Sequence, residues 1–241
     1  MIRKTAFAAL ALLAAAPAFA QVAKGSSSDY TEEVIYSENK HEVVTNSFWN
    51  NWFVSAGGGA QMYFGDHDRQ LTFGQWVSPA LDVAVGKWFN PSIGARIMYS
   101  GLTLNGATQD GTHSLGTDIK GKPQQGFWLE NSRFGYFHLH ADAMFNLCSI
   151  FGGYKEDRLY GCSPYVGVGL MRAYDAPVCT SFAFDAGIFN SFRVSPSIDI
   201  NIDIRGTIVS DRFDGEVGGR SGEGLITVSA GLTYRFGPRG W

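Results

Sequence analysis

The sequence predicts an all-β chain in which eight long strands close into an antiparallel up-and-down barrel. Eight stretches alternate apolar and polar residues with a period of two, which is the spacing of a strand and not of a helix. Short turns and long polar loops alternate between these stretches. The 241 residues are 45% hydrophobic and only 17% charged, yet no apolar run reaches the ~18 residues of a membrane helix.

The first twenty residues have the pattern of a secretory signal peptide. Arg3 and Lys4 precede an apolar stretch at residues 6–16, and Ala18-Phe19-Ala20 forms a small-x-small cleavage site. We therefore expect residues 1–20 to be removed on export. Residues 21–48 are expected to form a polar periplasmic segment, and residues 49–241 the barrel.

The alternating runs are clearest at residues 197–208, where isoleucines share one face and polar or charged residues the other. All eight runs have 11 to 15 residues, whereas strands of soluble proteins usually have about 5–6. A tilted strand that crosses a membrane needs about 9–11. The length therefore predicts a transmembrane β-barrel with strands at 52–64, 76–89, 92–104, 133–147, 164–174, 180–194, 197–208 and 226–236.

The connections between the runs indicate which end of the barrel faces outward. Asn90-Pro91 and Ser195-Pro196 suit tight turns, whereas 65–75, 105–132 and 210–223 are long. Outer-membrane barrels have short periplasmic turns and long external loops, and an even strand number places both termini in the periplasm. Connections 148–163 and 175–179 depart from this rule, the first by its length and the second by its shortness.

A soluble barrel is the alternative, and it would place the isoleucines of residues 197–208 inside. Aromatic residues at both ends of the runs favour the membrane, because two such belts are typical of a barrel in a bilayer. We expect glycines of the first and fifth runs, such as Gly57 and Gly167, to permit curvature or close approach of a neighbouring group. The two aromatic belts are predicted to contain Phe64, Trp76, Phe134, Tyr174 and Phe182 at the loop end, and Trp52, Trp88, Phe89, Phe192, Tyr234 and Phe236 at the turn end.

The polar face carries charges of both signs, and the lumen of eight strands is filled by side chains. Buried charges must pair there, because an unpaired one costs several kcal/mol. We predict a structural charge network of Asp82, Arg96, His138, His140, Asp142, Asp185, Asp199, Asp203, Arg205 and Arg235.

His138, His140 and Asp142 alternate along one run and face the lumen together. Such a set could form a metal site or a His/Asp catalytic pair, but no glutamate or cysteine joins it at ligand spacing in the same run. We interpret the three residues as part of a hydrogen-bond network with Arg96 as a partner. No catalytic residue, metal or cofactor is expected.

Several stretches resemble the membrane domain of outer-membrane protein A and its relatives. They are residues 50–55 leading to Tyr63-Phe64-Gly65, residues 78–88 before Asn90-Pro91, residues 164–169, and the ending Gly231–Phe236. The turn GKWFNPSIGAR at 86–96 and the loop DRFDGEVGGR at 211–220 are typical of one branch of that superfamily. The resemblance covers residues 49–241.

The resemblance implies a barrel of the Gram-negative cell outer membrane, inserted by the barrel assembly machinery through an aromatic terminal strand. Tyr234 and Phe236 match that signal, although five residues follow Phe236. Many relatives continue into a peptidoglycan-binding domain. None follows here, so peptidoglycan anchoring is not carried over, and the chain is either barrel-only or part of a longer protein.

The preferred function is a structural outer-membrane barrel that supports envelope integrity. Its partners are then membrane lipids and lipopolysaccharide, with host or surface ligands at the outer loops. A small porin-like channel is the alternative. An enzyme with rim residues from 66–69 and His113-Ser114 ranks third, because no recognisable motif joins them. The net charge of −3 provides no basic field for nucleic acid.

Two further features of the loops carry predictions. Asp211, Asp214 and Glu216 suggest cation binding or bridging to lipopolysaccharide phosphates, although their spacing is not that of a calcium loop. Cys148 and Cys162 bracket connection 148–163, and export to an oxidising compartment makes a disulfide between them possible. The third cysteine, Cys179, has no predicted disulfide partner.

Overall fold

The computed structural model describes residues 48–119, 128–216 and 222–236. By its internal contacts the chain divides into Met1–Val43 and Val44–Trp241, and the described residues belong to the second unit. The predicted signal peptide and residues 21–47 of the predicted polar segment lie outside the described residues. No helix among the described residues is long and apolar enough to cross a membrane.

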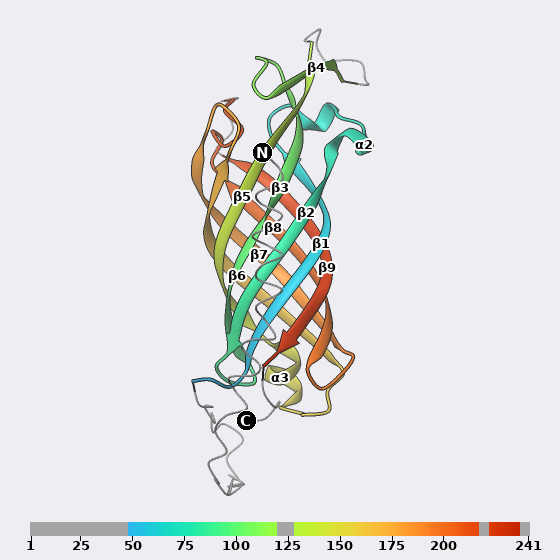
Figure 1. Ribbon diagram of the computed structural model, residues 1–241, viewed down its shortest axis with the longest axis vertical. Helices are drawn as coiled ribbons and strands as arrows, with labels where there is room; N and C mark the ends of the chain where they lie inside the picture. Colours follow the sequence, from blue (N-terminus) through green and yellow to red (C-terminus); the bar gives the residue numbers. More distant parts are fainter. Residues whose placement is uncertain (1–47, 120–127, 217–221, 237–241) are drawn as a thin grey trace, which may run out of the picture. The chain divides into compact units, whose positions relative to one another are not determined.

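The barrel wall consists of eight antiparallel strands, each paired with the next along the chain (Figure 1). Pairing of the first strand with the last closes the ring. The predicted fold class is confirmed, and so are the eight strands. They are β1 (Trp52–Phe64), β2 (Val77–Trp88), β3 (Ile93–Thr108), β5 (Glu130–Phe145), β6 (Tyr160–Ala173), β7 (Thr180–Arg193), β8 (Ile198–Val209) and β9 (Glu223–Arg235).

The closing seam between β1 and β9 depends on glycine. Gly57 lies opposite Gly231 in the register of the two strands. A Cβ atom on Gly231 would overlap the backbone of Ala56 and Gly57. The close approach of the two strands therefore requires glycine at this position.

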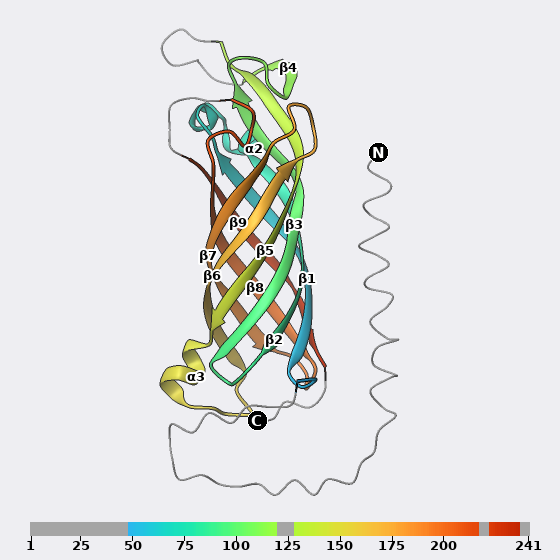
Figure 2. The same ribbon diagram turned by 90° about the vertical axis from the view of Figure 1, so that its left-hand side faces the viewer.

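Short elements occupy the two ends of the barrel (Figures 1 and 2). The strand β4 (Ser114–Asp118), the 3-10 helix η1 (Asp68–Gln70) and the helix α2 (Phe73–Trp76) lie at one end, here called the loop end. The helix α3 (Leu147–Gly152) lies at the opposite end, here called the turn end.

The β3–β5 pair is longer than predicted. It continues from Asn105–Arg133 to Thr108–Glu130, and β4 adds a pairing of Ser114 with Ser132. Much of the predicted loop 105–132 is therefore strand. Polar residues form this extension, so the apolar alternation that marks the rest of the strand is missing there.

The direction of the side chains separates the membrane barrel from the soluble alternative. In β8 the isoleucines are 38% to 64% exposed on the outside, whereas the alternate residues are at most 5% exposed and face the lumen. A soluble barrel requires the reverse arrangement. An apolar outer face around a polar interior is the pattern of a barrel in a bilayer.

Two members of the predicted aromatic belts lie inside instead. Phe134 and Trp88 are 1% and 6% exposed and belong to clusters within the lumen. Phe134 shares its face of the strand with His138, and Trp88 shares its face with Asp82. Alternation therefore directs both aromatic rings inward. Other predicted members, including Phe89, Tyr174, Phe182, Phe192 and Tyr234, are exposed on the outer surface.

Candidate functional site

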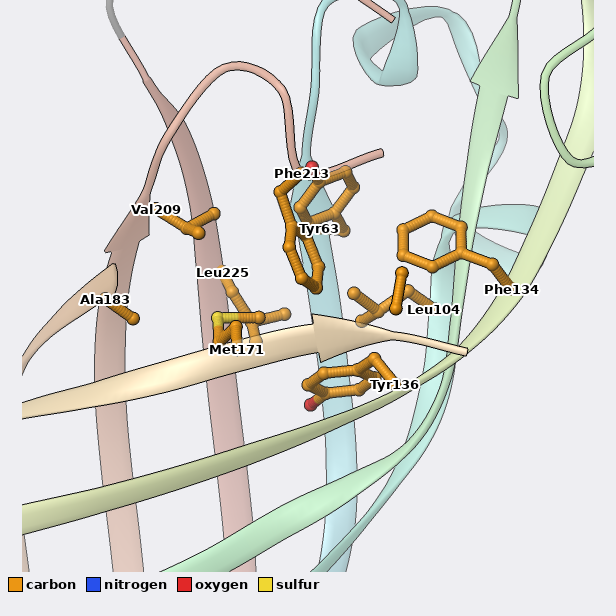
Figure 3. Close-up of a cluster of buried hydrophobic side chains, with 10 residues drawn as sticks. Tyr63, Leu104, Phe134, Tyr136, Met171, Ala183, Val209, Phe213 and Leu225 are labelled. Atoms are coloured by element: carbon orange, nitrogen blue, oxygen red, sulfur yellow. The ribbon is translucent and has the colours of Figure 1, made fainter. Parts of the chain in front are cut away.

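The lumen is filled at its loop end by a hydrophobic cluster (Figure 3). Phe213 comes from the β8–β9 loop and packs edge-on against Tyr63, Phe134 and Tyr136, with ring centroids 5.8 to 6.3 Å apart. Every barrel strand except β2 contributes a residue to this loop-end cluster. Its members are Tyr63, Leu104, Phe134, Tyr136, Met171, Ala173, Ala183, Val209, Phe213 and Leu225.

A second hydrophobic cluster lies toward the turn end. Phe53, Trp88, Met144, Tyr165 and Phe189 form this turn-end cluster, and all are at most 6% exposed. Burial of such rings excludes water from the space that they occupy.

A polar layer lies between the two clusters and contains most of the predicted lumen residues. Arg235 lies apart from this layer and pairs with Asp199, Nε to Oδ2 2.7 Å, with its side chain 23% exposed. The other eight are at most 5% exposed. They are Asp82, Arg96, His138, His140, Asp142, Asp185, Asp203 and Arg205.

Arg96 connects opposite walls of the barrel. Its Nε donates to Asp142 Oδ2 on the neighbouring strand β5 at 2.6 Å, and its Nη1 lies 2.8 Å from Asp203 Oδ2 on β8. The guanidinium also lies over the ring of Tyr165, 4.2 Å from its centroid. Three strands separate β3 from β8 in either direction around the ring, so this side chain crosses the lumen.

Arg205 of β8 crosses in the opposite direction. Its Nη2 donates to Ser100 Oγ at 2.7 Å and lies 3.2 Å from Asp82 Oδ1. Hydroxyl groups of Ser100 and Ser229 also donate to Asp82, each at 2.6 Å. The buried Asp82 carboxylate thus has a cation and two hydroxyl donors, as a buried charge requires.

His138 and His140 stack side by side, with ring centroids 4.4 Å apart. His140 Nδ1 lies 2.7 Å from Asp142 Oδ1, and His138 Nε2 lies 3.3 Å from Asp185 Oδ2. The sequence places three of these residues on β5, but it gives no sign that Asp185 of β7 joins them. That contact depends on barrel closure and register.

A group of carboxylates at the loop end was not recognised as a unit from the sequence. Asp68 accepts hydrogen bonds from the backbone N–H groups of Gly65 and Ala107, each at 2.7 Å. Burial raises the pKa of Asp68 to about 7 and the pKa of Asp214 to about 6. Nearby carboxylates add to both shifts.

The candidate rim residues have structural contacts. His67 Nε2 lies 3.4 Å from Glu216 Oε1, and the ring of His113 stacks on Phe134 at 4.7 Å. Ser114 donates a hydrogen bond to Glu130. These contacts join the loops to each other and to the loop-end cluster.

The structure contains no bond between Cys148 and Cys162, the pair considered as a possible disulfide. Cys148, Cys162 and Cys179 are all free and partly buried in the structure. Cys148 lies within α3, whereas Cys162 lies in β6. The expectation rested on the compartment and on the placement of both cysteines at the ends of neighbouring runs, whereas the positions of the two Cβ atoms decide whether a bond forms.

The chain is similar in sequence to two curated proteins. Outer membrane proteins 40 and 41 of Porphyromonas gingivalis strain W83 are 25% and 26% identical, over 80% and 66% of this chain. The chain spans 48% and 38% of their lengths. No family model matches the chain.

Solved structures that are similar to the chain include Neisserial surface protein A and OprG of Pseudomonas aeruginosa. The first has a TM-score of 0.48 and 11% identity, and the alignment covers 77% of this chain and 97% of that one. The second has a TM-score of 0.45 and 8% identity, with 82% and 98% covered. With its closed ring of eight antiparallel strands and its apolar outer face, the chain has the fold of an eight-stranded transmembrane β-barrel, and it is similar to curated outer membrane proteins.

Proposed function

We propose that this barrel is a non-conducting structural component of the outer membrane that supports envelope integrity. The proposal rests on Arg96 and Arg205, which cross the lumen in opposite directions and are at most 2% exposed. An ion that passes through the lumen has to displace both side chains from their carboxylate partners. Breaking a buried ion pair costs about 3–5 kcal/mol.

The two hydrophobic clusters support the same proposal. A solute that enters from the loop end meets Phe213 and its neighbours, and one that enters from the turn end meets Trp88 and Phe53. The polar layer alone would favour the alternative, a small channel. With apolar side chains above and below the layer, its charges serve to hold the walls together.

Planar-bilayer recording of the purified, folded chain tests this proposal. We expect silence or rare small events. Steady nanosiemens-scale conductance would contradict it and favour the channel. Folding of each preparation is verified by its different migration on a gel before and after heating. Lipid and peptide turnover by the same preparation tests the third possibility, an enzyme, and we expect none.

We further propose that the loop end faces outward and contacts lipopolysaccharide, surfaces or host ligands. Phe73, Leu115 and Trp128 are 54% to 75% exposed at that end, beyond the barrel wall, and are therefore accessible to such partners. In this orientation both termini lie in the periplasm, after export through the signal peptide and insertion by the barrel assembly machinery.

The orientation has a direct test with matched positions at the two ends. Leu115→Cys at the loop end and Phe151→Cys at the turn end both replace exposed residues. In a background where the three native cysteines are serine, a membrane-impermeant maleimide should label Leu115→Cys on intact cells and leave Phe151→Cys unlabelled. The reverse pattern would overturn the orientation without affecting the proposal of a closed lumen.

A further inference from the structure

Three potential metal ligands converge in the polar layer. His140 Nδ1, Asp142 Oδ1 and Asp185 Oδ2 all lie within 4.8 Å of one another. His140 Nδ1 is 2.7 Å from Asp142 and 3.8 Å from Asp185, and His138 Nε2 is 3.3 Å from the same Asp185 oxygen. Ligands at about 2.0–2.2 Å from a tetrahedral zinc ion lie about 3.4 Å apart. The distances bracket that value.

Two of these side chains have atoms without a hydrogen-bond partner. His138 is fully buried, and its Nδ1 has no hydrogen-bond partner among the described residues. His138 Nε2 and Asp185 Oδ2 face each other at 3.3 Å without the geometry of a hydrogen bond. Buried polar atoms are nearly always satisfied, and an ion bound between His138 and Asp185 would satisfy the two facing atoms.

The other atoms of the two carboxylates are already held in place. Thr207 donates to Asp185 Oδ1 at 2.6 Å, and Arg96 donates to Asp142 Oδ2 at 2.6 Å. Each carboxylate therefore keeps one oxygen free of these donors and directed at the imidazoles. Such outer contacts orient the ligands in metal sites.

Two glycines of β6 leave room for the side chains of the candidate metal ligands. A Cβ atom on Gly167 of β6 would overlap Asp142 Oδ1, and one on Gly169 would lie 2.8 Å from His138 Nε2. Any other residue at either position would displace a ligand atom.

The charge of the polar layer favours a cation. It contains four aspartates, Asp82, Asp142, Asp185 and Asp203, but only two arginines. With neutral imidazoles the layer has a surplus of two negative charges, which one divalent ion neutralises. Burying uncompensated charge is costly.

One contact opposes binding and limits its strength. Arg205 Nη1 lies 3.3 Å from His140 Nε2, where a guanidinium can only donate. A metal on Nδ1 requires the ring proton to move to Nε2, and this contact is then lost. Arg205 keeps shorter contacts to Met98 and Ser100, at 2.8 and 2.7 Å, so it stays anchored.

We propose that His138, His140, Asp142 and Asp185 bind one divalent transition-metal ion of the zinc class inside the lumen. Imidazole nitrogens with carboxylate oxygens are donors that zinc accepts. The two hydrophobic clusters close the lumen, so the ion enters as the barrel folds and then exchanges slowly.

The test is retention of metal by the full chain, without a polyhistidine tag, refolded in detergent with Zn²⁺ or Co²⁺ and freed of unbound ion on a chelating resin. We expect one metal ion per chain by mass spectrometry, and visible absorption typical of low-coordinate Co²⁺. His138→Ala, His140→Ala and Asp185→Asn should each lower the retained metal by about tenfold or more. His113→Ala, a histidine at the loop end, should retain as much metal as the unaltered chain.

Two outcomes overturn the proposal. The first is an unaltered, folded chain that retains neither metal, a result that depends on no variant. The second is Asp185→Asn with undiminished metal. Variants are compared only where migration before and after heating shows a folded barrel, and His138→Gln replaces any variant that does not fold. Conductance is unaffected by these results, so this proposal and that of a closed lumen fail separately.

Discussion

Arg96 of β3 and Asp203 of β8 form an ion pair across the full width of the barrel, Nη1 to Oδ2 2.8 Å, with both side chains almost completely buried. Arg205, two residues from Asp203 along β8, makes the return connection to Ser100 on β3. The pair of connections makes the polar layer a structural brace between opposite walls.

Removal of Arg205 should be severely destabilising. Arg205→Ala leaves Asp82 buried without its cation, and we expect a loss of about 3–5 kcal/mol in the free energy of unfolding. Urea-induced unfolding in lipid vesicles measures the loss. Arg172→Ala, which removes an exposed arginine from β6, is the matched control and should change stability by less than about 1 kcal/mol. Equal effects of the two changes would contradict the role of Arg205 as a brace.

Phe213 should close the loop end of the lumen, but it should not be the sole barrier to the passage of ions. Phe213→Ala removes the ring that packs on Tyr63, Phe134 and Tyr136, and we expect a loss of roughly 3 kcal/mol. In planar bilayers the single variant should stay silent because the arginines still cross the lumen. Combining Phe213→Ala with Arg96→Ala should increase the frequency of small conductance events. A conducting single variant would place the barrier in the loop alone.

The loop-end structure should loosen as pH rises. The pKa of Asp68 is about 7 in the folded chain against an ordinary value of 3.8, so the folded state binds the proton more tightly. The stabilising contribution is complete below about pH 4 and is lost as pH rises through 7. After correction for intrinsic rates, the amides of Gly65 and Ala107 should exchange hydrogen faster at pH 8 than at pH 5.

Asp68→Asn provides the comparison for that measurement. The amide carries no charge at any pH, so the difference between pH 5 and pH 8 should largely disappear. The variant also loses one of the two acceptors for Gly65 and Ala107, so its exchange should be faster at pH 5. A pH-independent profile for the unaltered chain would show that Asp68 does not govern the loop.

Gly167 should not tolerate a methyl group. Gly167→Ala places a Cβ atom on Asp142 Oδ1, and overpacking of this kind costs about 1–3 kcal/mol. Gly58→Ala on β1 is the matched control, because its Cβ would meet only Ala80 O at 3.6 Å. Urea unfolding compares the two, and indistinguishable midpoints would show that Asp142 moves aside without cost.

Local periodicity predicted much of this molecule and tertiary contacts decided the rest. The alternation in β8 was enough to place Asp203 and Arg205 on one face, because a strand has only two faces. The same rule would have placed Phe134 inside with His138, had it been preferred over the aromatic-belt pattern. The polar extension of β3 and β5 could not be found from hydrophobicity.

The sequence pattern could not predict which lumen residues contact each other. Arg205 and Asp82 are 123 positions apart, and only closure of the ring brings them together. Phe213 lies in a loop whose composition indicates exposure. Its inward position depends on the space left among Tyr63, Phe134 and Tyr136.

The crossing arginines also have a consequence for assembly. Arg96 and Asp203 belong to strands that lie four places apart around the ring, so an open sheet of fewer strands leaves both charges without each other. Partly formed barrels therefore contain unpaired charges that are costly in a bilayer, and only the complete ring removes this cost. Insertion should therefore be cooperative, because the unpaired charges raise the free energy of every partly formed barrel relative to the closed one.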